Sequence, residues 1–295
     1  MNDKRTTLSE AVALVEDGSS LGIASPAVNP MALVPMATIR ELVRQGKQGL
    51  TLYSAMGNIE GDMLIGAGCI KDAHFWAFNL FGSGPPPNFR RAALAGTVKM
   101  REQSEFSITL GVLAGSMGIQ FIPLHGYQND HLQHHPEWHT FTSPIDGTEL
   151  LTITAIVPDV ALIHVPKADK YGNAQLGDTN RDNVMAKFMA PRMVQAAKKV
   201  ILTAEEIIPN EQIRKTPDLT SILYHDVDAV VHVPEGAHPH GLSDYYSPDS
   251  GHIAAYLDAA QTPESFSSYL QRYVYGPEDH AAYLRVVAED EGEKL

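Results

Sequence analysis

Cysteine is nearly absent from this 295-residue sequence, which contains a single one, Cys69. One cysteine excludes an intramolecular disulfide and a cysteine-rich zinc site. Cys69 lies in the apolar stretch IGAGCI. That setting is typical of a buried, unreactive thiol and does not favour a nucleophile.

Long apolar runs are also missing. No stretch reaches the roughly 18 apolar residues that cross a membrane. The opening MNDKRTTLSE lacks the apolar segment of a secretory signal. The sequence therefore predicts a cytoplasmic protein with no membrane partner.

Basic residues are outnumbered, because 22 lysines and arginines face 35 aspartates and glutamates, a formal net charge of −13. Such a surface repels phosphate backbones, so we expect no nucleic-acid partner. The sequence also lacks a P-loop and a GxGxxG phosphate motif. Hydrophobic residues make up 44% of the chain, which excludes a disordered protein and allows a substantial core.

Short apolar runs alternate with helical patterns along the chain. Runs typical of strands occupy 20–24, 50–55, 73–79, 119–124, 160–165, 199–203 and 228–233, and helical patterns occupy 8–16, 31–45, 104–117 and 183–197. This alternation predicts an α/β fold, an open and mainly parallel sheet with helices on both faces. We expect one domain over 1–295, with a loop-rich excursion at about 125–150 and a helical C-terminal part at about 249–289.

Polar side chains at helix starts give capping signals. Thr7 with Glu10 three residues later has the spacing of a capping box. Asn29 followed by Pro30 predicts the start of the second helix. Asn173 and the glycines of YGN and PEGAHP indicate turns first, and no GxSxG hydrolase elbow is present.

Two loops are candidates for a phosphate cradle, at 24–29 (ASPAVN) and 82–87 (GSGPPP), and the first follows a strand and opens a helix. In open α/β sheets, ligands bind at this carboxyl edge, where helix N-termini present free N–H groups. Ser25, Asn29, Ser83 and Gly84 are therefore candidates for a ligand pocket. Ordinary strand-to-helix connections explain the same loops equally well.

Ser104 can cap the helix predicted at 104–117, and two glutamates, Glu102 and Glu105, flank this serine. Helix capping by these carboxylates is the favoured interpretation, because the helix dipole stabilises negative charge there. The alternative hypothesis is that one of these two glutamates is a catalytic acid, base or nucleophile. Glu205 and Glu206 form a second candidate pair at the end of a strand.

Five histidines lie close together in the sequence: His125, His131, His134, His135 and His139. His131 and His135 have the helical spacing of two metal ligands. There is no HExxH pattern, and Pro136 interrupts a helix there. We therefore favour a polar surface loop or a subunit contact, and we expect no metal.

Four segments carry a family resemblance: 87–124 (PNFRRAALAGTVKMREQSEFSITLGVLAGSMGIQFIPL), 159–178 (DVALIHVPKADKYGNAQLGD), 198–209 (KKVILTAEEIIP) and 233–246 (VPEGAHPHGLSDYY). In this order they resemble the α (A) subunit of family I coenzyme A transferases, in the branch similar to glutaconate CoA-transferase. The opening TLSEAVALVEDGSSLGIA is also similar. DKYGNAQ and GAHP at this spacing are fairly specific, whereas either motif alone is weak.

The resemblance implies an enzyme that moves coenzyme A between carboxylic acids, with acyl-CoA as substrate and no covalently bound cofactor. It also implies a partner, the β subunit, whose glutamate attacks the thioester of a small or dicarboxylic acyl-CoA. An acyl-glutamyl anhydride and then a glutamyl-CoA thioester form. This chain would shape the acyl and CoA pocket, with Ser25, Asn29, Ser83, Gly84 and Glu102 as the candidate residues.

Two features depart from the family pattern. The family's Gly-Gly-Phe and Gly-x-Pro steps are replaced by ASPAVNP at 24–30, which lacks the glycines that adopt positive φ. The nucleophile motif Ser-Glu-Asn-Gly is missing from this chain. A transferase would therefore require the β subunit.

A related branch contains hydrolases that open a ring in bacterial steroid breakdown. There the α-type chain supplies a glutamate in a segment similar to REQSE, and Glu105 matches it. In that alternative Glu105 is a base toward water or a carbon acid. A third hypothesis is a non-catalytic scaffold subunit. Arg90, Arg91 and Lys170 are candidates for CoA phosphates, and a solvated helix face explains the arginines equally well.

Overall fold

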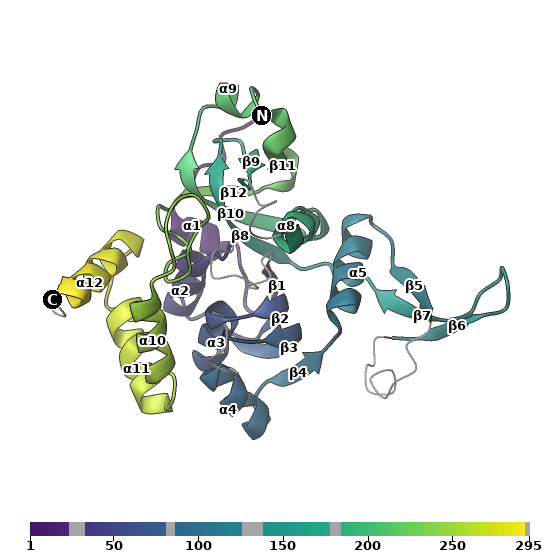
Figure 1. The fold of residues 1–295 in the computed structure, drawn as a ribbon, viewed down its shortest axis with the longest axis horizontal. Coiled ribbons are helices and arrows are strands. Elements are labelled where there is room, and N and C mark those ends of the chain that lie inside the picture. The colour runs from purple at the N-terminus through teal and green to yellow at the C-terminus, as the bar shows by residue number, and fades with distance from the viewer. Residues whose placement is uncertain (24–32, 81–85, 126–137, 178–183, 293–295) are drawn as a thin grey trace.

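The computed structural model describes residues 1–23, 33–80, 86–125, 138–177 and 184–292 (Figure 1). A nine-stranded main sheet organises the fold. Its strands are β1 (Ser20–Ile23), β2 (Leu50–Gly57), β3 (Ile70–Phe78), β4 (Lys99–Glu102), β8 (Val160–Ala168), β9 (Ala174–Gln175), β10 (Lys199–Ile207), β11 (Thr220–Ile222) and β12 (Ala229–His232).

Seven of these strands run parallel in the order β12-β10-β8-β1-β2-β3-β4. The short β9 pairs antiparallel with the carboxyl end of β8 and with β11. The central strands are apolar on both faces, as burial under two helical layers requires. The predicted fold class is confirmed.

Helices cover both faces of the main sheet (Figure 1). One core joins β1, β2 and β3 to α1 (Leu8–Ala13), α2 (Met36–Arg44), α3 (Ile59–Gly66), α4 (Pro87–Ala95), α10 (Ser250–Ala259) and α11 (Pro263–Leu270). The other core joins β8 and β10 to α5 (Glu105–Ser116) and α8 (Val184–Ala196). Gly22 of β1 permits this second layer, since a Cβ there would lie 2.4 Å from Met193 Sδ.

The region predicted as a loop-rich excursion contains strands. β5 (Phe121–His125), β6 (Thr140–Thr142) and β7 (Glu149–Thr154) form a separate antiparallel sheet that extends away from the body beside α5 (Figure 1). The expected strand at 119–124 thus belongs to this second sheet. The sequence does not reveal β7, because half of its residues are polar or exposed.

One predicted boundary and two whole helices differ from expectation. The predicted second helix is present, but α2 begins at Met36 with Pro35 at its N-cap, so the predicted start at about Met31 is wrong. The sequence patterns do not predict α3 and α4. Seven of the eight residues of α3 are buried, so it lacks the polar face that makes a helix visible in a sequence.

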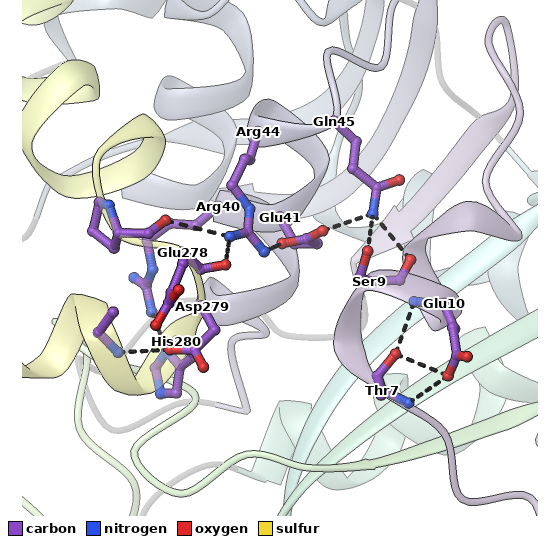
Figure 2. A network of polar contacts seen from close by, with 12 residues as sticks. Thr7, Ser9, Glu10, Arg40, Glu41, Arg44, Gln45, Glu278, Asp279 and His280 are labelled. Atoms are coloured by element: carbon purple, nitrogen blue, oxygen red, sulfur yellow. Dashed lines mark hydrogen bonds and ion pairs between the residues drawn. The ribbon is translucent and has the colours of Figure 1, made fainter.

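The C-terminal segment contains α10, α11 and α12 (His280–Gly292), with a π-helical turn at Gln271–Tyr275. Polar contacts attach it to α2 (Figure 2). Arg44 binds both the Glu41 carboxylate and the Glu278 carbonyl. In the same view, Thr7 and Glu10 form the predicted capping box of α1. No helix in the described ranges is long and apolar enough to cross a membrane.

Candidate active site at the carboxyl edge of the sheet

The parallel strands end at one edge of the main sheet, here called the carboxyl edge, and several acids follow them. β2 leads to Glu60, β4 leads to Glu105, β10 carries Glu205 near its end, and the turn after β12 contains Glu235. Helices α3 and α5 also begin at this edge. It is therefore the expected place for a ligand in an open α/β fold.

Glu105 is the first residue of α5, and two serines cap that helix. Ser104 Oγ accepts the Ser107 N–H at 2.9 Å, and Ser107 Oγ accepts the Ser104 N–H at 3.0 Å. The capping hydrogen bonds thus come from serine side chains, whereas Glu105 lies in the first turn, where the helix dipole favours its charge, and Glu102 precedes the helix. Glu105 is half-buried, and its carboxylate has no hydrogen bond or ion pair within the described ranges. An unpaired carboxylate at a helix N-terminus is available for chemistry.

Glu102 ends β4 and is exposed. The residue after it, Gln103, is buried and fixes the turn that leads to Glu105. Its N–H donates to the Phe75 carbonyl at 2.8 Å, and its side-chain nitrogen lies 3.3 Å from His74 Nδ1. The position of Glu105 relative to β3 is thus set by the backbone of β4 and by Gln103.

Glu205 is oriented by a buried histidine and a backbone amide. Its two oxygens accept the Glu235 N–H at 3.0 and 2.8 Å, and Oε2 lies 3.4 Å from His164 Nε2. His164 Nδ1 lies 3.0 Å from Thr203 Oγ1. The order Thr, His, Glu is that of a nucleophile triad, but Thr203 is 0% exposed, so substrate does not reach its hydroxyl. Burial lowers the pKa of His164, which favours the neutral imidazole.

The PEGAHP turn after β12 packs closely against this group. A Cβ on Gly236 would lie 2.6 Å from the His164 ring, so only glycine fits. The Ala237 N–H donates to Tyr246 Oη at 3.1 Å. Tyr245 Oη donates to Glu206 at 2.7 Å, so the second glutamate of the predicted pair also has a hydrogen-bond partner.

The DKYGN motif is a turn built around Asp169, as predicted. Asp169 Oδ1 accepts the N–H groups of Tyr171, Gly172 and Asn173 at 2.9 to 3.0 Å. Gly172 supplies the positive φ of +103°. Asp169 Oδ2 accepts from the side chains of Asn173 and Asn210, both at 2.7 Å. This motif joins β8 to β9 and has a structural role.

Asp62 in α3 is a buried acid that connects three helices. It accepts hydrogen bonds from the Asn88 side chain at 2.9 Å, the Phe89 N–H at 2.7 Å and Tyr256 Oη at 2.7 Å. Burial raises the pKa of Asp62, and these donors oppose the rise by stabilising the carboxylate. Asp62 thus holds α4 and α10 against α3.

Sequence reasoning does not identify the two buried acids of α3, Glu60 and Asp62, or their neighbour His240. The available signal is an acidic helix start, GNIEGD, directly after the strand LTLYSA. The glycine in that stretch favours a turn, which hides the helix. His240 stands next to the GAHP motif, and no pattern assigns it a role.

Other predicted residues fall into three groups. Ser25, Asn29, Ser83, Gly84, His131, His134 and His135 lie outside the described residues. His125 and His139 are exposed, and the described part of the chain contains no cluster of three metal-ligating side chains. Cys69 is buried, as predicted, and burial raises the pKa of its thiol to about 11, which disfavours the reactive thiolate.

Arg91 is committed to structure. It donates to the carbonyls of Ala260 at 2.7 Å and Gln261 at 3.0 Å, and it also binds the Asn88 side chain. It therefore satisfies the free carbonyls at the end of α10. Arg90 is exposed, and Lys170 Nζ lies 5.1 Å from the Tyr171 ring centroid.

The open parallel sheet with acids at its carboxyl edge is typical of α/β proteins that bind their ligands at that edge. The family model described as Coenzyme A transferase matches residues 5–232, well over half of the chain. This chain belongs to the coenzyme A transferase family.

Relatives with named functions differ in the reactions they catalyse. The A-subunit of 3-oxoadipate CoA-transferase from Pseudomonas knackmussii is 30% identical over 96% of this chain and 98% of its own length. The cholesterol ring-cleaving hydrolase IpdA subunit of Rhodococcus jostii is 28% identical over 98% of both chains. An uncharacterized protein of Archaeoglobus fulgidus is 36% identical over 97% of this chain, which spans 63% of that protein.

Solved structures agree with this assignment. Glutaconate coenzyme A-transferase from Acidaminococcus fermentans superposes with a TM-score of 0.85 at 28% identity, covering 96% of this chain and 92% of that one. The decarboxylase AibA/AibB superposes with a TM-score of 0.77 at 30% identity, covering 92% of this chain and all of that one.

Proposed function

We propose that this chain is the α subunit of a heteromeric CoA transferase that moves coenzyme A between small or dicarboxylic acids. The observation that carries the proposal is the 30% identity to the 3-oxoadipate CoA-transferase chain across nearly the whole of both sequences. The A-subunit of glutaconate CoA-transferase from Acidaminococcus fermentans, 30% identical over 85% of this chain, supports the same substrate class.

The nucleophilic glutamate belongs to a β subunit in this proposal. Ser-Glu-Asn-Gly is missing from this sequence, and β2 ends in Ser54-Ala55-Met56-Gly57. Two other acids of this edge serve the fold, because Asp62 is held by three donors and Glu205 by the Glu235 amide. A nucleophile from the partner is therefore the simpler arrangement.

The chemistry then proceeds by balanced acyl exchange. The β-subunit carboxylate attacks the thioester carbon, and the CoA thiolate leaves as an acyl-glutamyl anhydride forms. The thiolate attacks the glutamyl carbonyl and releases the first acid, giving glutamyl-CoA. A second acid reverses these steps. Backbone N–H groups at the carboxyl edge would stabilise each oxyanion, and Ser25, Asn29, Ser83, Gly84 and Glu102 would line the acyl and CoA pocket.

The test is an activity assay of the purified chain, alone and co-expressed with its β partner. Acyl-CoA and acetate are supplied, and acetyl-CoA and free CoA are both followed. We expect acetyl-CoA to form only in the sample that contains both subunits. CoA transfer by this chain without a β subunit would contradict the proposal. So would the absence of CoA transfer by the verified two-subunit complex when several acyl-CoA substrates are tried.

One observation favours a second candidate function, a ring-opening hydrolase with Glu105 as base. The Glu105 carboxylate is half-buried and has no partner among the described residues, and the relative from Rhodococcus jostii is named as a ring-cleaving hydrolase subunit. Glu105 would take a proton from water, whose hydroxide attacks a carbonyl carbon. Glu105→Gln should then abolish acceptor-independent turnover, while the control Glu264→Gln, at an exposed acid in the first turn of α11, retains it. Full activity of a folded Glu105→Gln protein would exclude this role.

A further inference from the structure

A buried acid and a buried histidine face each other near the carboxyl edge. Glu60 lies in the first turn of α3, and His240 follows the GAHP turn. Glu60 Oε1 accepts the Asn58 N–H at 3.0 Å, whereas Oε2 has no hydrogen-bond partner among the described residues and lies 3.7 Å from His240 Nε2. Both ring nitrogens of His240 likewise lack a hydrogen-bond partner there. Neither side chain is more than 1% exposed.

No cation of the described residues is bonded to this pair. Asp62 is the titratable neighbour on α3, and its negative charge disfavours ionisation of Glu60. His238 is the titratable neighbour of His240. The nearby Arg40 is occupied, since it donates to the His238 carbonyl at 2.8 Å and stacks 3.7 Å from the Tyr283 ring centroid.

Two buried hydroxyls among the described residues are also unpaired. The hydroxyls of Thr38 in α2 and Ser54 in β2 are buried without hydrogen-bond partners in the described part of the chain. The Ala37 N–H donates to the Gly236 carbonyl at 2.9 Å, so the start of α2 contacts the turn that precedes His240. Polar groups left unpaired in a core destabilise the folded state, which indicates a role other than packing.

The count of protons decides how the pair is charged. A carboxylate oxygen and an unprotonated imidazole nitrogen both carry lone pairs and repel each other, so the facing atoms need one proton between them, carried either by the Glu60 carboxyl or by Nε2 of a neutral His240. A buried ion pair without further donors is costly. Burial raises the pKa of Glu60 to about 7 and lowers the pKa of His240 to about 4, which favours a neutral acid beside a neutral imidazole below pH 7.

We propose that Glu60 is a positioning residue that acts as a neutral carboxylic acid directed at His240, and that loss of this proton disturbs the carboxyl edge. The pair joins two turns of that edge. Glu60 holds the Asn58 amide, and the Asn58 side chain donates to the Asn79 carbonyl at 2.9 Å. His240 belongs to the turn whose Glu235 amide binds Glu205. This inference is independent of the reaction that the family member catalyses.

The sign of the pH effect follows from the raised pKa. Glu60 contributes stability fully below its ordinary pKa of 4.5, and that contribution is lost as the pH rises through about 7. Above that pH the folded protein buries the Glu60 carboxylate without a compensating positive charge. Glutamine mimics the neutral acid, so Glu60→Gln should remove this alkaline loss.

The experiment measures thermal unfolding of the full chain at pH 5.5 and pH 8.5. We expect Glu60→Gln to melt within a degree or two of wild type at pH 5.5 and several degrees above it at pH 8.5. Glu41→Gln is the matched control, because Glu41 is also buried but is paired with Arg44 and Gln45. It should melt below wild type at both pH values.

Infrared spectroscopy supplies the second readout. The carbonyl band of a protonated carboxylic acid should be present in wild type at pH 6, diminish by pH 8.5, be reduced in Glu60→Gln and be retained in Glu41→Gln. A Glu60→Gln protein that is less stable than wild type at pH 8.5 would overturn the proposal. An unchanged infrared band in that variant would overturn it as well, since Glu60 would then be ionised.

Discussion

Two helices, α3 and α5, begin at the carboxyl edge directly after parallel strands, and both have acids in the first turn. In α3 the acids are buried, and three donors hold the Asp62 carboxylate. In α5 the cap is made by Ser104 and Ser107, and Glu105 is half-buried without a partner in the described ranges. The same sequence signal thus has two different meanings.

The difference teaches that partners, more than position, separate structural acids from candidate catalytic ones. A carboxylate with several donors in the core is part of the packing, and its removal leaves those donors unpaired. A carboxylate with none is free to accept a proton from substrate or water. Substitutions at the two helix starts test this contrast.

Asp62→Ala should have the largest effect on stability. It leaves Asn88, the Phe89 amide and Tyr256 without their acceptor in the core, so we expect a loss of about 3 kcal/mol or more in the free energy of unfolding. Urea denaturation measures it, with Asp62→Asn as the milder control. A loss below about 1 kcal/mol would contradict the structural role of Asp62.

Acid should destabilise the contact between α2 and α12. Arg40 donates to His280 Nδ1 at 3.2 Å, and His280 Nε2–H donates to the Pro234 carbonyl at 2.8 Å, so the ring is neutral. Burial and Arg40 lower the pKa of His280 to about 3. Its contribution to stability is therefore complete above the ordinary pKa of 6.5 and is lost as the pH falls toward 3.

Urea unfolding of wild type and His280→Asn between pH 7 and pH 4 checks this effect. The free energy of unfolding of the wild type should exceed that of the variant by less and less as the pH falls. The opposite contribution of Glu60 is common to both proteins, so it cancels in this difference. An advantage that stays constant over this range would mean that His280 does not titrate in the way described.

Ser104→Ala should have an intermediate effect. It removes the side-chain acceptor of the Ser107 N–H at the start of α5, and we expect a loss of about 1 kcal/mol in the free energy of unfolding. Chemical denaturation measures it, and Ser104→Thr should restore most of the stability. A neutral Ser104→Ala would show that α5 does not depend on this cap.

Glu105→Gln should have the smallest effect on folding. The carboxylate has no partner to lose among the described residues, so the free energy of unfolding should change by no more than about 0.5 kcal/mol. The same denaturation experiment tests this prediction beside Asp62→Ala. A large destabilisation would place Glu105 with the structural acids and remove it as a catalytic candidate.

Much of the fold follows from local patterns in the sequence. The buried strands around Leu21, Leu52 and Leu162 are apolar runs, and Thr7 and Ser104 cap helices where the capping signals predict them. α3 escapes prediction because it is buried on nearly every side. The antiparallel sheet of β5, β6 and β7 depends on pairing between distant residues, which no local pattern specifies.

The candidate site is harder to predict than the fold. The sequence points to Glu105 and Glu205 because one follows a predicted strand at a helix start and the other follows the strand KVILT. It does not point to Glu60 and His240, since the two are 180 positions apart and meet only through tertiary packing. Nor does it show that Arg91 binds the carbonyls at the end of α10.

The central claim, that the covalent intermediate forms on a partner glutamate, is tested most directly by intact-protein mass spectrometry. The co-purified subunits are incubated with acyl-CoA without an acceptor acid, and each chain is weighed. We predict that the β subunit carries a CoA adduct and that this chain carries none. A CoA or acyl adduct on this chain that disappears in Glu105→Gln would contradict the account and make Glu105 the nucleophile.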